Sequence, residues 1–117
     1  MKYMIRAAIL AGAAAFCIAS GSAARADVVR VAVVIADNAA DYQANAALLP
    51  AFADMLKKGG GKEVHVATDA AHMTVTSVSV FPDAAAVGAV TGSDAWKAEA
   101  AKLKSKSYTI GVYDILP

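Results

Sequence analysis

The order of its short β-branched runs and long amphipathic runs is the feature that most constrains the fold of this chain. Residues 28–36 (VVRVAVVIA) are short and rich in β-branched residues, which favours a strand. Residues 39–58 carry apolar side chains at three-, four- and seven-residue spacings, which predicts an amphipathic helix. Two alternating runs, 62–68 and 73–81, flank a short polar break at 69–72 and predict an antiparallel hairpin.

The ends of the predicted helices carry clear signals. Asn38 is placed to cap the first helix, Pro50 predicts a kink within it, and residues 59–61 (GGG) end it. Its buried stripe comprises Tyr42, Leu49, Phe52 and Leu56. A short helix after Pro82–Asp83 runs to about Val90, and Ser93 caps a second helix at 94–104 with Trp96, Ala100 and Leu103 on one stripe. A closing strand is expected at 107–116.

This order is β-α-β-β-α-β. It predicts an α+β, ferredoxin-like fold, in which a four-stranded antiparallel sheet carries two helices on one face.

The first 26 residues have the three parts of a secretory signal. Lys2 and Arg6 form a basic start, residues 7–19 are apolar, and residues 24–26 (ARA) form an A-x-A cleavage pattern. We therefore expect residues 1–26 to be a signal peptide and 27–117 to be one exported domain, periplasmic or secreted. A lipoprotein reading rests on Cys17, but Phe16 stands where a lipobox has a small residue.

Cleavage would change the cysteine content and the net charge, which limit the chemistry and the binding partners of the domain. Cys17 is the only cysteine, so the mature domain would have no disulfide and no thiolate chemistry. Loss of three basic residues would leave eight basic and ten acidic side chains, a formal charge of −2. The domain lacks a basic patch, which argues against nucleic acid as a partner, and lacks a second apolar run of spanning length.

Two local phrases carry a family resemblance: residues 81–85 (FPDAA) and residues 93–96 (SDAW). With the element order, they resemble the dimeric α/β-barrel superfamily, which includes antibiotic-biosynthesis-monooxygenase-like and NIPSNAP-like domains. The resemblance implies a homodimer in which two sheets pair face to face. It also implies that the open sheet face becomes a barrel interior, which serves as the pocket in the enzymes.

Activity within the superfamily varies. Some members degrade haem with a histidine on the last helix, but residues 94–106 contain none, so haem degradation is not expected. Cofactor-free oxygenation of aromatic substrates stays open, and we expect no cofactor.

The candidate catalytic residues follow from strand alternation. If the large residues Val29, Val31, Val33 and Ile35 face the helices, Arg30 points into the barrel. By the same alternation, Val64 and Val66 face the helices, while Glu63 and His65 share the Arg30 side. Ser77, Ser79 and Tyr113 could join this group, which would orient a phenolate or carboxylate and move a proton. In the alternative interpretation, Arg30 and Glu63 form a structural ion pair.

Other candidates have simpler explanations beside them. Asn38 and Tyr42 could bind a ligand at the barrel mouth, or serve as a cap and a core aromatic. Trp96 could line a pocket or pack the second helix. His65 and His72 are the only histidines, and two histidines without a nearby carboxylate cluster do not indicate a zinc site, which needs three or four ligands. A hydrolase motif and a phosphate-binding glycine loop are both missing from the sequence.

Two functional hypotheses remain. The first is a homodimeric ligand-binding or structural module without turnover. The second is a cofactor-independent, monooxygenase-like enzyme that acts on a small aromatic or hydrophobic molecule.

Overall fold

The computed structural model describes residues 4–6 and 27–116. The signal-peptide prediction therefore lies mostly outside the described residues. Within them, the chain forms five strands, three α-helices and one short 3₁₀ helix. In chain order these are β1 (Met4–Arg6), β2 (Val28–Ile35), α2 (Ala39–Lys58), β3 (Glu63–Asp69), η2 (Ala70–His72), β4 (Thr74–Phe81), α3 (Ala84–Thr91), α4 (Asp94–Ala100) and β5 (Ser107–Leu116).

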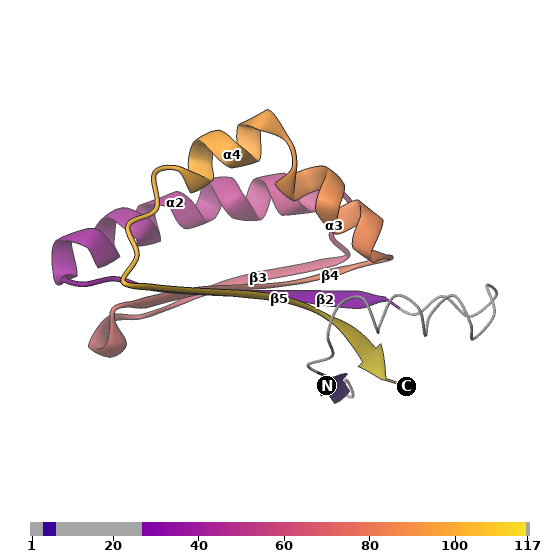
Figure 1. The fold of residues 1–117 in the computed structure, drawn as a ribbon, viewed down its shortest axis with the longest axis horizontal. Helices are drawn as coiled ribbons and strands as arrows, with labels where there is room; N and C mark the ends of the chain where they lie inside the picture. Colours follow the sequence, from indigo (N-terminus) through magenta and orange to yellow (C-terminus); the bar gives the residue numbers. More distant parts are fainter. Residues whose placement is uncertain (1–3, 7–26, 117) are drawn as a thin grey trace.

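The strands form one antiparallel sheet in the order β1-β5-β2-β4-β3. The four strands after residue 27 have the order of a ferredoxin-like sheet, which confirms the predicted fold. β1 adds a fifth strand beside β5, and it comes from the stretch that the sequence predicts to be a signal peptide. The three α-helices that the structure describes, α2, α3 and α4, lie on one side of the sheet (Figure 1).

The predicted caps and stripe of the long helix are confirmed. The Asn38 side chain accepts a hydrogen bond from the Asp41 backbone N–H at 2.8 Å and so starts α2. The helix then runs through Pro50 to Lys58 and ends at Gly59. Its buried residues are Tyr42, Asn45, Leu49, Phe52 and Leu56, which adds a polar residue to the predicted stripe.

The last helix is shorter than the sequence indicates. Ser93 caps α4 as expected, but the helix ends at Ala100 and not at Lys104. The backbone of Lys104 is instead held by Asn45 of α2, whose side chain donates to the Lys104 carbonyl at 2.8 Å and accepts from its N–H at 2.9 Å. Because this long-range pair occupies both backbone groups, residues 101–106 form a strap between α4 and β5.

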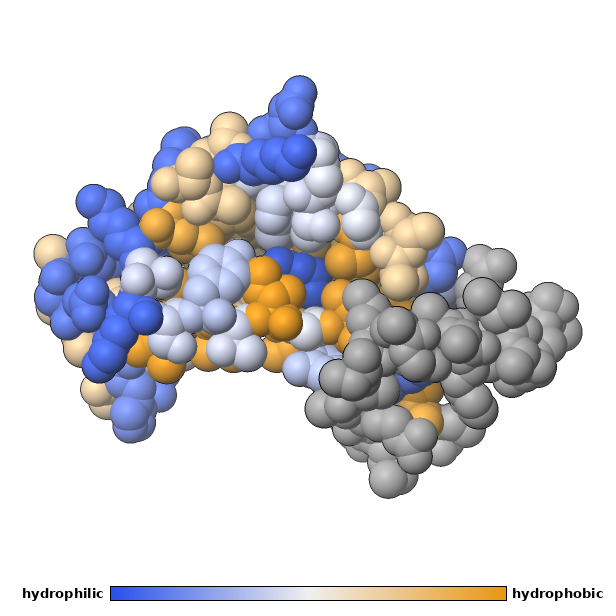
Figure 2. All heavy atoms as spheres, in the orientation of Figure 1, coloured by the Kyte–Doolittle hydropathy of each residue, from blue (hydrophilic) through white to orange (hydrophobic). Residues whose placement is uncertain are grey.

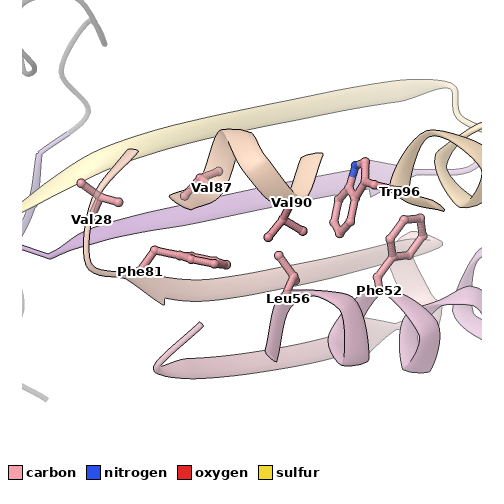
Figure 3. Packing of buried hydrophobic residues seen from close by; sticks show 7 residues of the cluster. All are labelled: Val28, Phe52, Leu56, Phe81, Val87, Val90 and Trp96. Carbon is pink, nitrogen blue, oxygen red and sulfur yellow. The ribbon is translucent and has the colours of Figure 1, made fainter. Parts of the chain in front are cut away.

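The main core lies between the helices and the sheet. Its buried cluster brings together all three α-helices and the ends of two strands: Val28, Phe52, Leu56, Phe81, Val87, Val90 and Trp96 (Figure 3). The Phe52 and Trp96 rings meet edge to face, with centroids 4.8 Å apart. A second cluster covers the other end of α2 with Val34, Ala36, Tyr42, Leu49 and Val75.

The prediction of which side of β2 faces the helices is wrong. Val28 and Val34 belong to the helix-side clusters, so Arg30 and Ala32 between them also point toward the helices. Val29 instead packs with Val80 and Ile115, beside Val31, Val78 and Tyr113, on the other side of the sheet, which we call the open face. Both faces of β2 are apolar, so side-chain size does not distinguish them.

Of the part of the chain that the structure describes, no helix is both long enough and apolar enough to cross a membrane.

Candidate functional site

A concavity lies between β2 and the helical layer. We call it the Arg30 hollow. It is lined by Arg30, Ala32, Val34, Leu49, Phe52, Val75, Thr76, Ser77, Trp96, Leu103 and Tyr108. Its empty volume is about 360 Å³, including space open to solvent, but the centre of a water molecule has only about 30 Å³ in which to move. The hollow as it stands therefore holds only a few waters or a small chemical group.

Arg30 is the charged residue of this hollow. Its side chain is only 2% exposed although it is a full-length guanidinium. Nη1 donates a hydrogen bond to Ser77 Oγ at 3.2 Å, and the guanidinium carbon lies 4.9 Å from the centre of the Trp96 ring. The indole face thus offers the cation a favourable but uncharged partner.

The electrostatic setting of Arg30 is unusual. Burial lowers the pKa of Arg30, and the nearby Tyr108 acts in the opposite direction. Arginine nevertheless stays protonated at neutral pH. The ion pairs that join described residues do not include Arg30. A buried cation without a carboxylate is costly, and it attracts an anion that can reach it.

Two serines of β4 accompany the arginine. Ser77 and Ser79 pair with Ala32 and Arg30 of β2, so their side chains share the helix side of the sheet. Both are buried, and Ser79 Oγ has no hydrogen-bond partner among the described residues. The prediction that Ser77 and Ser79 lie on the Arg30 side is confirmed.

Two sets of hydrogen bonds, one local and one long-range, hold Trp96 and Leu103 over the hollow. The Ser93 hydroxyl accepts the Trp96 N–H at 3.3 Å, which fixes the first turn of α4 and the start of the tryptophan side chain. The Asn45 side chain holds Lys104, and with it the neighbouring Leu103, against α2. Trp96 and Leu103 thus keep their positions over the hollow through the Ser93 cap of α4 and the buried amide of Asn45.

The histidine and glutamate predicted to accompany Arg30 lie elsewhere. Glu63 and His65 pair with Val80 and Val78, which places both on the open face. Their side chains face one another at 3.6 Å, and that of His65 is 72% exposed. The predicted shared cavity with Arg30 is therefore wrong, as is the alternative Arg30–Glu63 ion pair.

The other predicted residues divide between the two faces. Trp96 and Ser77 line the hollow. Tyr113 lies on the open face, and its ring fills the space beside Gly111 where a Cβ would stand. Asn38 serves as the cap of α2, and Tyr42 is a core residue.

Tyr108 is an aromatic lining residue that the sequence pattern alone does not single out. It pairs with Val34 in the β2–β5 register, so it lies on the helix side, two residues from Ile110. Alternation along β5 places Tyr108 and Ile110 on one face of the strand. Only the pairing of β5 with β2 shows that this face is turned toward the helices.

The hollow offers little acid–base chemistry. None of its described lining residues is a histidine, aspartate or glutamate, the side chains that most often move protons in enzymes. Across residues 27–116, no three histidine, cysteine, aspartate or glutamate side chains gather closely enough to hold a metal ion. The arrangement can therefore bind and stabilise an anion. The described lining residues do not offer a base that would take a proton from a substrate.

Neither protein-family models nor curated proteins match this sequence. Solved structures do match. A candidate antibiotic biosynthesis monooxygenase from Caulobacter crescentus aligns with a TM-score of 0.68 at 14% identity, over 80% of this chain and 92% of that one. The fold is that of the antibiotic biosynthesis monooxygenases. The resemblance seen in the sequence is thereby confirmed for the fold.

Two further solved structures share this fold. SnoaB from Streptomyces nogalater, a cofactor-independent oxygenase, aligns with a TM-score of 0.60 at 13% identity, over 74% of this chain and 90% of that one. A protein of unknown function from Nitrosomonas europaea aligns with a TM-score of 0.63 at 18% identity, over 80% and 92%. At these identities the likeness extends to the fold alone.

Proposed function

We propose that this domain binds a small organic anion with an aromatic or hydrophobic body, whose charged group enters the Arg30 hollow. The observation that carries the proposal is the buried guanidinium, which has a serine and an indole as partners but no carboxylate among the described ion pairs. An anionic ligand would supply the missing countercharge in a site of low dielectric, where charge-assisted hydrogen bonds are strong.

The test is a thermal-shift comparison of two probes of nearly equal shape. Benzoate carries the charge, whereas benzyl alcohol does not. Ligand that binds only the folded state raises Tm as its concentration rises. We expect a concentration-dependent increase with benzoate and little change with benzyl alcohol. Equal shifts with both probes, or none with either, would contradict the proposal.

A second candidate is cofactor-independent oxygenation of the bound molecule. It is favoured by the fold shared with SnoaB and by a cation placed to stabilise an enolate or phenolate. In such a reaction an activated CH₂ carbon becomes a carbonyl, one oxygen atom of O₂ enters, and the other leaves as water. The substrate supplies all the electrons. Since the hollow lacks a base, the substrate itself must be acidic, as a hydroxyaromatic compound is.

An oxygen electrode separates the two candidates. Uptake of O₂ in the presence of an easily oxidised hydroxyaromatic compound, lost in Arg30→Met, would show turnover. Ligand binding without O₂ uptake would support a ligand-binding module without turnover.

We also propose that the domain is a homodimer that pairs through its open face. Val29, Val80 and Ile115, which are already buried in this structure, form the apolar centre of that face, with Val31 and Val78 packed beside them. The proposal rests on the resemblance of the sequence to the dimeric α/β-barrel superfamily.

Export remains part of the proposal. The sequence pattern of residues 1–26 supports it, and cleavage after Ala26 would remove β1 and leave β5 as an edge strand. N-terminal sequencing of protein recovered outside the cytoplasm tests it: an N-terminus at Asp27 is expected, and one at Met1 would contradict it.

A further inference from the structure

An uncovered apolar strip continues outward from the Arg30 hollow along β5. Tyr108 and Ile110 lie on the helix side of the sheet, opposite Val34 and Ala32, which both line the hollow. They are 42% and 46% exposed, the highest values among the large hydrophobic residues of the described chain. We call Tyr108 and Ile110 the β5 strip.

The strip is exposed because the helical layer does not reach it. The long helix α2 packs against β3 and β4, on the other side of β2. In the space-filling view, hydrophobic residues come to the surface below the helices, in the middle of this side (Figure 2). Tyr108 belongs to both the hollow and the strip, so the two surfaces are continuous.

The charge of the hollow limits the head group of a ligand. Arg30 is the only charged side chain among the described lining residues, which suits one negative charge better than two. A guanidinium is a planar fork that matches the two oxygens of a carboxylate. The small free space beside it excludes a bulky head group.

We propose that the ligand is an amphipathic monocarboxylate, with its carboxylate at Arg30 and its apolar body laid over Tyr108 and Ile110. This inference rests on the proposed function and specifies its ligand class. The apolar body is the occupant of the β5 strip, because the strip adjoins the cationic hollow directly and offers no charge of its own.

The test uses straight-chain acids as probes and the single tryptophan, Trp96, as the reporter. Hexanoate, octanoate and decanoate are titrated at concentrations below micelle formation, with decanol as the uncharged control. We expect affinity to rise about two- to four-fold for each methylene that reaches the strip, as burial of apolar surface predicts. Decanol should bind much more weakly than decanoate.

Two variants test whether Ile110 causes the dependence of affinity on chain length. Ile110→Thr should abolish most of the dependence on chain length while leaving hexanoate binding nearly unchanged. The matched control is Val66→Thr, since Val66 is 38% exposed on the same face but at the β3 edge of the sheet. This control should keep the full dependence.

The outcomes separate this inference from the function on which it rests. Hexanoate binding with no dependence on chain length, or a dependence that Ile110→Thr retains, would overturn the inference and leave anion binding intact. Equal binding of decanol would overturn the assignment of the head group. Loss of a wild-type dimer in Ile110→Thr, seen by sedimentation velocity, would assign the strip to a second copy of the chain instead. Failure of every acid, benzoate included, would remove the proposed function as well.

Discussion

At the scale of the residue, the charge of Arg30 lies at a position where it adds little to the stability of the folded protein. It lies within the layer of apolar side chains that joins α2 and α4 to the sheet, with Trp96 over its guanidinium. Desolvation of a cation there costs several kcal/mol, which one serine and one indole offset only in part. Arg30 is therefore explained better by a ligand than by stability.

This reasoning predicts the stability of Arg30→Met. Methionine keeps the length and flexibility of the side chain and removes the buried charge. We expect a free energy of unfolding equal to that of the wild type or higher by about 1–4 kcal/mol, as for other buried charges replaced by apolar residues. Denaturant unfolding measures it. A loss of several kcal/mol would assign Arg30 a structural role.

A second residue-scale prediction concerns the turn between β3 and β4. The Asp69 carboxylate accepts a hydrogen bond from His72 Nδ1 at 2.7 Å, and this side-chain bond is the main cause that lowers the pKa of Asp69. A lowered pKa in the folded state gives stability above the ordinary pKa of aspartate, which is lost as the pH falls through the folded value. Because the pair is exposed, the effect on stability is small.

The measurement for this pair is an NMR titration of the Asp69 carboxyl. His72→Ala should raise the pKa of Asp69 toward its ordinary value. His65→Ala, which changes the other histidine near the start of the same strand, should leave it unchanged. An unaltered titration in His72→Ala would refute the assigned cause.

At the scale of the element, the strap 101–106 is fixed to α2 by one buried side chain. Asn45 is fully buried and satisfies both backbone groups of Lys104. Its replacement by alanine leaves these groups without partners, at a cost of about 1–3 kcal/mol. We expect Asn45→Ala to lower the free energy of unfolding by that amount and to speed amide exchange at Lys104.

The control for the strap is Asn38→Ala. It removes the cap of the same helix at an exposed site, at a cost of about 1 kcal/mol. Exchange at Lys104 should not change in this variant. Equal exchange rates at Lys104 in both variants would show that the strap does not depend on Asn45.

The elements after residue 27 could be predicted from sequence to within a residue or two, except the end of α4, whereas β1 was not predicted. Alternation, caps and glycines are local signals, and they agree with the fold. The shortened α4 depends on Asn45, which is 59 residues from Lys104 and leaves no local trace.

The site could be predicted only in part. Alternation shows which residues share a strand face, but not which face is turned toward the helices. A strand covered on both sides shows no contrast between faces, and an error of one position moves every side chain to the other face. Val29 and Val31 lie on the open face, while the helix side holds Val28 and Val34 as well as Arg30 and Ala32. Arg30, Ser77 and Trp96 were thus identified as candidates, but His65, Glu63 and Tyr113 were assigned to the wrong face relative to Arg30.

At the scale of the whole molecule, the helices cover one face of the sheet, and the proposed dimer covers the other (Figure 1). A charge placed in that second interface would meet its own copy or an apolar neighbour. We expect Val31→Asp to sediment as a monomer where the wild type sediments as a dimer. Val66→Asp, at the β3 edge and on the helix side, should remain dimeric. A monomeric wild type would contradict the dimer directly.

The central claim is that the Arg30 hollow receives an organic anion, and Trp96 allows it to be tested from within the hollow. Emission of Trp96 is followed while benzoate is added to the wild type, Arg30→Met and Arg30→Lys. The account predicts a saturable change in the wild type, a weakened one in Arg30→Lys, and none in Arg30→Met, which stays folded. The same saturation curve in Arg30→Met as in the wild type would contradict it.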